Sequence, residues 1–255
     1  MKKLLFLSTL LFSMLFCVEF MSCSKDDDDD DKGKSCPLLG AWTMTDMLGG
    51  IQKYYYFGQN GKAAEINVSF DTHKQYKGYF FNVREYSVTG NKLLIDDSSV
   101  TFSLKDKTLI LSFGIDEMEF KAVDYNEVKE YIDGVPQLLA GVWLQSDIEV
   151  GGVGNSIQYM ILNDDFSADE LEVYFDEYGI YQKSYVYHGK WSFSNLIFNL
   201  DTKGFSKKCL VSVDNVTGKE LSYHYYDKNH NNKELGFYRW DMNDIQYYLD
   251  NATKK

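Results

Sequence analysis

The sequence predicts a mainly β protein made of two small antiparallel β-barrels in tandem, each closed by a short C-terminal helix. An internal repeat divides most of the chain into two copies, and short segments within each copy alternate between apolar and polar residues. The composition also favours strands over helices, because 20 Tyr and 17 Phe accompany only two Pro among 255 residues.

The internal repeat is clearest where the two copies end. The segment FKAVDYNEVKEYIDG at 120–134 aligns without gaps on FYRWDMNDIQYYLDN at 237–251. The copies also begin alike, because PLLGAWTMTD at 37–46 recurs as QLLAGVWLQSD at 137–147, with a Gly-x-Trp in each. Two related domains in tandem explain both matches.

Each end motif predicts a strand that runs into a short helix. Asp124 stands where a helix cap is expected, and Glu127 follows at the spacing of a capping box. Asp241 begins the same pattern in the second copy. An apolar stripe at positions i, i+3 and i+4 follows the first cap: Val128, Tyr131 and Ile132.

Between the opening and end motifs, segments of period two predict roughly seven to nine short strands in each copy. Examples are Val100–Leu104, Leu171–Asp176 and Leu196–Asp201, and turn signals such as the Asn-Gly at 60–61 separate them. This spacing is typical of an antiparallel barrel or sandwich. The polar outer faces favour an up-and-down barrel, which leaves no open sheet edge.

The Leu-x-Gly-x-Trp opening is followed by the aromatic segment YYYFGQNGK at 54–62 and by the turn segment YSVTGNKLLI at 86–95. Together these motifs resemble lipocalin-like domains, and more closely the lipocalin-like repeats of Bacteroidetes-type surface lipoproteins. The resemblance spans residues 38–251. It implies one lipocalin-like domain at 38–134 and a second at 138–251.

By the same resemblance, Trp42 and Trp143 would plug one end of each barrel, which is a structural role. Both copies are shorter than a full lipocalin. The interiors of such small barrels are often filled by side chains, so an open ligand cavity does not follow from the resemblance.

The first 22 residues read as a lipoprotein-type signal peptide. Lys2 and Lys3 precede the apolar run Leu4–Val18, and the small residue Ser22 precedes Cys23. The run is too short and too interrupted to be a membrane-spanning helix.

The segment after the signal resembles the same surface lipoproteins, in which a lipidated Cys followed by Ser and an acidic run marks the protein for the outer face of the outer membrane. Here Cys23 precedes the six aspartates Asp26–Asp31. We therefore expect a fatty-acyl (palmitate) anchor on Cys23 and an acidic linker over 23–37. One departure is that Phe20 and Met21 replace the Leu and small residue of a typical lipobox.

The formal net charge of −12 would repel phosphate backbones, which excludes nucleic acid as an expected partner. The cysteine count is too low for a disulfide-rich scaffold. With Cys17 in the signal and Cys23 assigned to lipid, Cys36 and Cys209 remain, either as one bridge or as two thiols.

No catalytic motif is present, so we expect no enzyme activity, no cofactor and no metal site. The four His are scattered, and neither H-E-x-x-H nor G-x-S-x-G occurs. The hexa-Asp run lacks the geometry of a calcium site. Asp227–Glu234 begins like a calcium loop, but Asn232 stands where such a loop needs Gly, so a polar hairpin loop is the plainer reading.

Three aromatic runs are the remaining candidates for binding: Lys53–Phe57, Tyr178–Trp191 and Leu221–Asp227. Their rings could stack on sugars or hold an apolar ligand, or they could simply pack across strands. The sequence thus predicts a surface-exposed outer-membrane lipoprotein that binds a small molecule, glycan or protein without catalysis. A structural subunit with filled barrels is the alternative, and a glycan-processing enzyme is a more distant one. The ligand-binding residues are not predicted.

Overall fold

The computed structural model describes residues 36–45, 49–96, 98–145, 156–202, 206–214, 216, 220–226 and 232–255. The expected signal peptide, Cys23 and the aspartate run lie outside these residues. Within them the protein is mainly β, and no helix is both long and apolar enough to cross a membrane.

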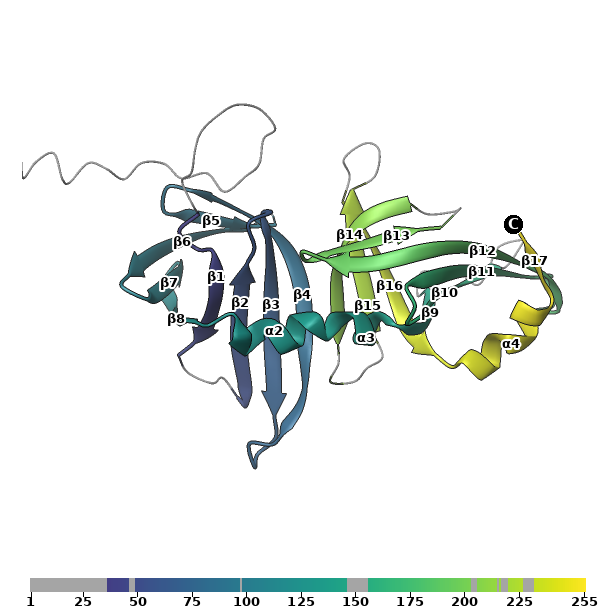
Figure 1. Cartoon of the computed structure of the whole chain (residues 1–255), viewed down its shortest axis with the longest axis horizontal. Coiled ribbons are helices and arrows are strands. Elements are labelled where there is room, and N and C mark those ends of the chain that lie inside the picture. The colour runs from purple at the N-terminus through teal and green to yellow at the C-terminus, as the bar shows by residue number, and fades with distance from the viewer. Residues whose placement is uncertain are drawn as a thin grey trace, which may run out of the picture.

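The first eight strands form a closed antiparallel barrel (Figure 1). Each strand pairs with the next one along the chain, and β8 pairs back with β1. The predicted barrel over the first copy is therefore confirmed. Its strands are β1 (Gly40–Met44), β2 (Ile51–Phe57), β3 (Lys62–Phe70), β4 (Tyr76–Thr89), β5 (Lys92–Ile95), β6 (Ser98–Lys105), β7 (Thr108–Phe113) and β8 (Asp116–Val123).

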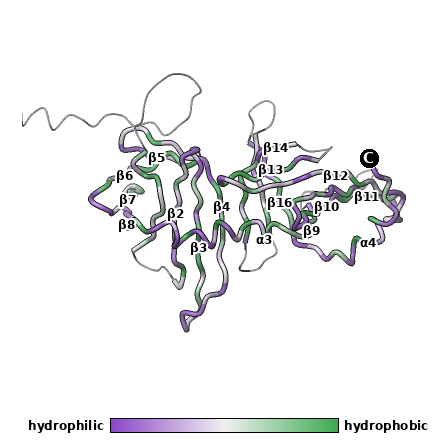
Figure 2. Tube along the Cα trace, in the orientation of Figure 1, coloured by the Kyte–Doolittle hydropathy of each residue, from purple (hydrophilic) through white to green (hydrophobic). Residues whose placement is uncertain are grey.

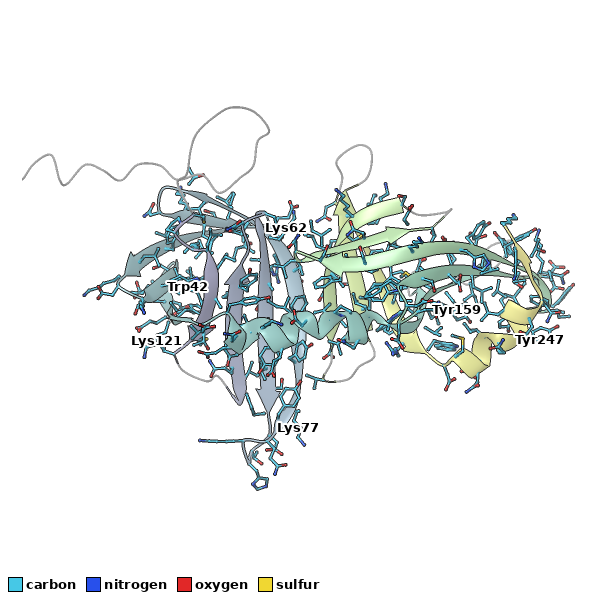
Figure 3. The ribbon with its side chains drawn as sticks, viewed as in Figure 1. Trp42, Lys62, Lys77, Lys121, Tyr159 and Tyr247 are labelled. Carbon is cyan, nitrogen blue, oxygen red and sulfur yellow. The ribbon has the colours of Figure 1, made fainter. Side chains whose placement is uncertain are left out.

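Apolar side chains from every side fill the interior of this barrel. Phe57, Leu93, Leu109 and Phe120 are each at most 1% exposed and belong to one cluster. Trp42 lies in the same cluster, and Figure 3 shows it within the barrel. This burial follows from the alternation of inward apolar and outward polar residues along each strand.

The shared opening motif has the same geometry in both copies. The indole nitrogen of Trp42 donates to the backbone oxygen of Leu38 at 2.8 Å, and that of Trp143 donates to Leu139 at 2.7 Å. The glycine between each pair has a positive φ, +114° at Gly40 and +136° at Gly141, a conformation that other residues rarely adopt. The motif therefore needs its glycine.

Nine further strands follow the barrel in the chain. From β9 to β16 each strand pairs antiparallel with the next, and β16 pairs with β9 as well as with β15. The short strand β17 lies parallel to β12. We call β9–β17 the second unit: β9 (Gly141–Gln145), β10 (Ser156–Leu162), β11 (Ser167–Phe175), β12 (Tyr181–Ser194), β13 (Ile197–Asp201), β14 (Ser206–Asp214), β15 (Glu220–Tyr226), β16 (Asn232–Trp240) and β17 (Ala252–Lys254).

Both predicted helices are present, α2 (Asn126–Asp133) and α4 (Met242–Asp250), and a short helix α3 (Val135–Leu139) follows α2. The predicted cap of α4 is confirmed, because Asp241 accepts a hydrogen bond from the backbone nitrogen of Asn243 at 2.8 Å. Asp124 accepts the same bond from Asn126, also at 2.8 Å, although the N-cap position of α2 is Tyr125.

The helices cover outer faces of strands. In β3, Ala63 points into the filled barrel, and its neighbour Ala64 points outward into a cluster with Val128 of α2. In the second unit, Ile245 of α4 packs against Val142 in a separate outer cluster. Figure 1 shows α2 running across β2–β4 toward the second unit.

One tertiary hydrogen bond recurs at equivalent places in the repeat. The hydroxyl of Tyr79, on β4, donates to the backbone oxygen of Tyr131 at 3.0 Å. The hydroxyl of Ser184, on β12, donates to the backbone oxygen of Tyr248 at 2.7 Å. Since Tyr131 and Tyr248 align in the repeat, the matching sequences make matching contacts.

The barrel and the second unit share a sheet edge. In β4 the segment Phe80–Asn82 pairs antiparallel with Ser212–Asp214 of β14. One core cluster combines the outward residues of β3 and β4, the helices α2 and α3, and inward residues of the second unit such as Trp143. The chain therefore forms one continuous body. Figure 2 shows that the tip of the β3–β4 hairpin is strongly hydrophilic.

The two cysteines that the sequence left open are not paired with each other. Cys209 is a free, buried thiol, so the alternative of a bridge between Cys36 and Cys209 is wrong. Burial raises the pKa of Cys209 to about 12, so its thiol stays protonated at neutral pH.

Candidate ligand-binding cavities

A cavity of about 530 Å³ lies where β4 of the barrel meets β13–β16 of the second unit. We call it the junction cavity. Its walls come from both parts of the chain, so it exists only because β4 and β14 are joined. The polar residues that line it include Asn82, Arg84, Asp96, Ser212, His224 and Glu234.

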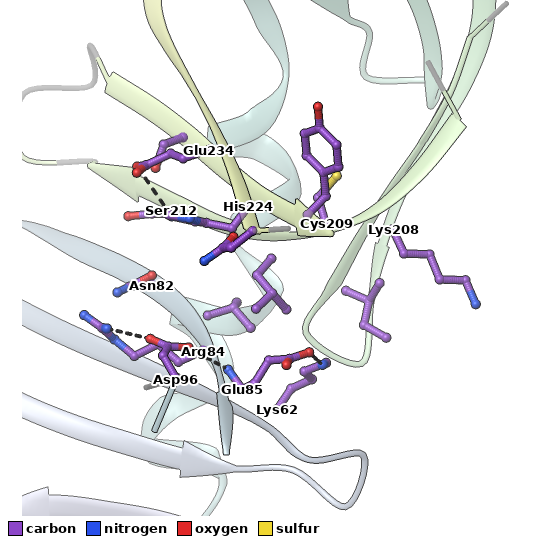
Figure 4. Close-up of a pocket in the computed structure, with 16 residues that line it drawn as sticks. Lys62, Asn82, Arg84, Glu85, Asp96, Lys208, Cys209, Ser212, His224 and Glu234 are labelled. Atoms are coloured by element: carbon purple, nitrogen blue, oxygen red, sulfur yellow. Dashed lines mark hydrogen bonds and ion pairs between the residues drawn. The ribbon is translucent and has the colours of Figure 1, made fainter. Parts of the chain in front are cut away.

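Asn82 lies at the seam of the junction cavity. Its backbone is paired with that of Ser212, and Figure 4 shows its side chain between Ser212 and the Arg84–Asp96 pair. Asn82 is only 8% exposed, and no hydrogen bond of its amide group is found among the described residues. Its amide atoms are not among the fully buried polar atoms that lack a partner, so they reach the open space of the cavity and are available to a ligand or to water.

Charged residues line the junction cavity in pairs of opposite sign. Arg84 donates from Nη1 to Asp96 Oδ2 at 2.8 Å, and His224 Nε2 lies 3.5 Å from Glu234 Oε1. Lys62 is paired with Glu85. Counting only Lys, Arg, Asp and Glu, the described lining has three cationic residues (Lys62, Arg84 and Lys208) and three anionic residues (Glu85, Asp96 and Glu234), so these charges balance.

Arg84 also links the cavity to the interior of the barrel. Its Nε makes no hydrogen bond but lies 3.4 Å from Glu65 Oε2. Burial lowers the pKa of Arg84, but the hydrogen bond to Asp96 and the charge of Glu65 outweigh this and keep the pKa raised. The guanidinium therefore stays charged and held in place.

A smaller cavity of about 140 Å³ lies inside the second unit, and we call it the inner cavity. Met160 and Glu170 of its lining alternate along β10 and β11 with Ile161 and Leu171 of the outer cluster around α4, so these two side chains point inward. The lining includes Glu170, Thr202, Tyr223, Tyr225, Leu235 and Phe237. The rings of Tyr223 and Phe237 are stacked at 4.9 Å.

Glu170 is the carboxylate of the inner cavity. It accepts a hydrogen bond from the hydroxyl of Thr202 at 2.8 Å. Burial raises its pKa, and the charge of nearby Glu172 raises it further, although the bond from Thr202 acts in the opposite direction. Glu172 itself accepts hydrogen bonds from Tyr174 and Tyr187.

The aromatic runs have mixed roles in the structure. In the first run, Tyr55 contacts Phe57 and Phe120 within the barrel, so its aromatic character serves packing. In the third run, Tyr225 lines both cavities. In the second run, Tyr185 lies on the same face of the sheet as Glu172 and Tyr174. The Nζ of Lys255 lies 3.6 Å from the ring centroid of Tyr185.

The other site candidates considered from the sequence, the calcium-like loop and the histidines, do not form a site in the described part of the chain. Residues 227–231 of the calcium-like loop are outside the described part of the chain, and Glu234 at its end is paired with His224. Among the described residues no three His, Cys, Asp or Glu side chains are grouped to hold a metal ion. Sequence reasoning did not single out Asn82, Arg84 or Glu170, because none belongs to a motif.

Comparisons with known proteins do not identify the chain. No family model matches it, and no curated protein matches it. Among solved structures, it is similar to the Helicobacter pylori beta clamp bound to a DNA ligase peptide, with 10% identity, a TM-score of 0.19, and coverage of 85% of this chain and 62% of that one. A Pseudomonas aeruginosa sliding clamp bound to griselimycin gives 7% identity, a TM-score of 0.18, and coverage of 85% and 61%.

A putative DNA polymerase III beta subunit from Eubacterium rectale gives 8% identity, a TM-score of 0.18, and coverage of 86% and 62%. The chain thus spans about three fifths of the length of these structures. TM-scores this low support no conclusion about fold or function.

Proposed function

We propose that this chain is a lipoprotein of the outer membrane, anchored through Cys23 and facing the outside of the cell, that binds a ligand without catalysis. The amino-terminal pattern supports the anchor: a basic start, an apolar run, Ser22, Cys23 and an acidic run. The junction cavity supports binding, because it combines an appreciable volume with the amide of Asn82, which makes no hydrogen bond among the described residues and faces the cavity.

We also propose that the chain consists of two tandem lipocalin-like barrels. The opening motif with its Trp-to-Leu hydrogen bond, the outer helix and the bond to Tyr131 or Tyr248 recur in both copies. The pairing of β16 with β9 supports closure of the second barrel.

The chemistry of the junction cavity favours a small, polar and uncharged ligand, such as a sugar unit of a glycan. Its charges are balanced, so a strongly charged ligand would find no compensating charge. The Asn82 amide, the Ser212 hydroxyl and the Arg84–Asp96 pair offer both donors and acceptors, while Leu210 and Tyr225 supply apolar surface.

The test is a glycan array followed by calorimetric titration of the best ligand. Replacing Asn82→Leu keeps the size of the side chain but removes its hydrogen bonds, and we expect the affinity to fall about tenfold or more. Asn199→Leu is the matched control, because Asn199 lies on β13 outside the cavity lining and should leave the affinity unchanged. Equal affinity in wild type and Asn82→Leu would remove the junction cavity from the proposal.

One observation favours the alternative, a structural subunit without a ligand. The first barrel is filled by a tight apolar cluster around Phe120 and Leu109, as a purely structural barrel would be. If no glycan or small molecule from a broad screen binds the purified chain, this alternative becomes the better account.

A further inference from the structure

Among the described residues that line the inner cavity of the second unit, Glu170 is the only Asp, Glu, Lys, Arg or His. The rest are apolar, aromatic or neutral polar residues, including Met160 and Leu200. We propose that this cavity binds a protonated amine that carries a small apolar body. The proposal concerns a different cavity and a different ligand chemistry from the proposed function, and it does not depend on the lipid anchor.

Glu170 has no cationic partner. No ion pair joins it to a Lys, Arg or His among the described residues, and the hydroxyl of Thr202 is its hydrogen-bond donor. Another carboxylate, that of Glu172, interacts with Glu170 electrostatically and acts to raise the pKa of Glu170. A carboxylate that is partly removed from water and has no cation is costly, and an ammonium group placed beside it offsets that cost.

The rings around the carboxylate suit the same ligand. Tyr223, Tyr225 and Phe237 all line the inner cavity, and the faces of aromatic rings attract cations. One such contact is already present, since the ammonium of Lys207, which is not among the residues that line the inner cavity, lies 5.5 Å from the ring centroid of Tyr225.

The size of the inner cavity limits the ligand. Its volume of about 140 Å³ corresponds to roughly five water molecules at their liquid density. An oligosaccharide does not fit, whereas a short alkyl ammonium does. A neutral alcohol of the same shape would fill the space but would leave Glu170 without a counter-charge, so charge is the property that separates the two ligands.

The test is a titration of the purified full chain, followed by backbone amide NMR, with n-butylammonium chloride and, separately, with n-butanol. We expect saturable shifts near Tyr223 and Phe237 with butylammonium and an affinity about tenfold or more above that for butanol. Glu170→Gln keeps the size of the side chain and should abolish this preference. Lowering the pH through the raised pKa of Glu170 should weaken butylammonium binding in the wild type only.

Glu234→Gln is the matched control, because Glu234 lines the junction cavity and not the inner one. It should leave the preference for butylammonium intact. The proposal is overturned if butylammonium gives no saturable shift at millimolar concentration, if butanol binds as tightly, or if Glu170→Gln retains the preference while its spectrum shows a folded protein.

Discussion

Individual residues in this chain carry roles that the sequence shows to different degrees. The glycine and tryptophan of the opening motif are visible because they recur, and the structure gives the reason: a positive φ at the glycine and an indole bond to the preceding Leu carbonyl. The sequence does not predict that Asn82 and Glu170 line cavities, because an isolated Asn or Glu on a strand cannot be told from a solvent-facing residue until its neighbours in the fold are known.

The indole bond of Trp42 makes a first prediction. Trp42→Phe leaves the Leu38 carbonyl without its buried donor, and we expect a loss of about 1–3 kcal/mol in the free energy of unfolding. Urea denaturation followed by circular dichroism measures this. Trp240→Phe is the control, since Trp240 is 41% exposed and should change stability by less than about 0.5 kcal/mol. Equal effects at both positions would contradict the assigned role.

The two buried glutamates predict opposite responses to pH. Burial acts to raise the pKa of Glu65, but Lys53, Asn67 and Arg84 outweigh it and hold that pKa below its ordinary value. Glu65 therefore stabilises the fold above the pKa it has when unfolded, and this contribution is lost as pH falls through the lower folded pKa. The pKa of Glu170 is raised, so its ionisation at neutral pH opposes folding.

We accordingly expect Glu65→Gln to lower stability at neutral pH, with the deficit shrinking in acid. Glu170→Gln should raise stability at neutral pH and lose that advantage in acid. Urea titrations of both variants and the wild type across the acidic range check this. If both variants were less stable than the wild type by an amount that does not change with pH, the two carboxylates would act through packing alone.

Secondary-structure elements were predictable to the extent that their signals are local. Alternation predicted strands such as β6 and β11, and the capping pattern predicted both α2 and α4. The place of the helices was not predictable, because an amphipathic helix shows one apolar face but not which strands it covers. Each helix lies on the outside of its strands, with α2 against β3 and α4 against β9.

The cap of α4 gives a prediction at this scale. Asp241→Ala removes the hydrogen bond to the backbone nitrogen of Asn243, and we expect a loss of about 1 kcal/mol in stability. Asp250→Ala, at the opposite end of the same helix, removes a negative charge near the carboxyl end and should be neutral or slightly stabilising. Thermal denaturation measures the stability of both variants. An equal loss of stability in both would contradict a stabilising role for the Asp241 cap.

At the scale of the whole molecule, the repeat predicted two related halves but not how they join. The pairing of β4 with β14 uses residues with no special composition, Phe80–Asn82 and Ser212–Asp214. Backbone hydrogen bonding between strands depends little on side-chain identity, so no sequence signal marks this seam. The junction cavity is a product of the seam and was unpredictable for the same reason.

The acidic run Asp26–Asp31 also concerns the whole molecule, because we expect it to determine on which side of the outer membrane the protein lies. Replacing Asp26–Asp31 by Asn should leave lipid attachment intact but reduce the amount of protein that an added protease can cleave on intact cells. Acyl labelling and whole-cell protease digestion measure the two effects separately. Unchanged protease sensitivity would count against an export role for the run.

The central claim, a lipid anchor at Cys23 that holds a binding protein on the cell surface, is tested most directly by metabolic labelling with a clickable fatty acid, followed by membrane fractionation. We predict that the wild type and Cys36→Ala are labelled and pellet with the outer membrane, and that Cys23→Ala is unlabelled and remains soluble. Labelling and membrane association of Cys23→Ala at wild-type levels would contradict the claim.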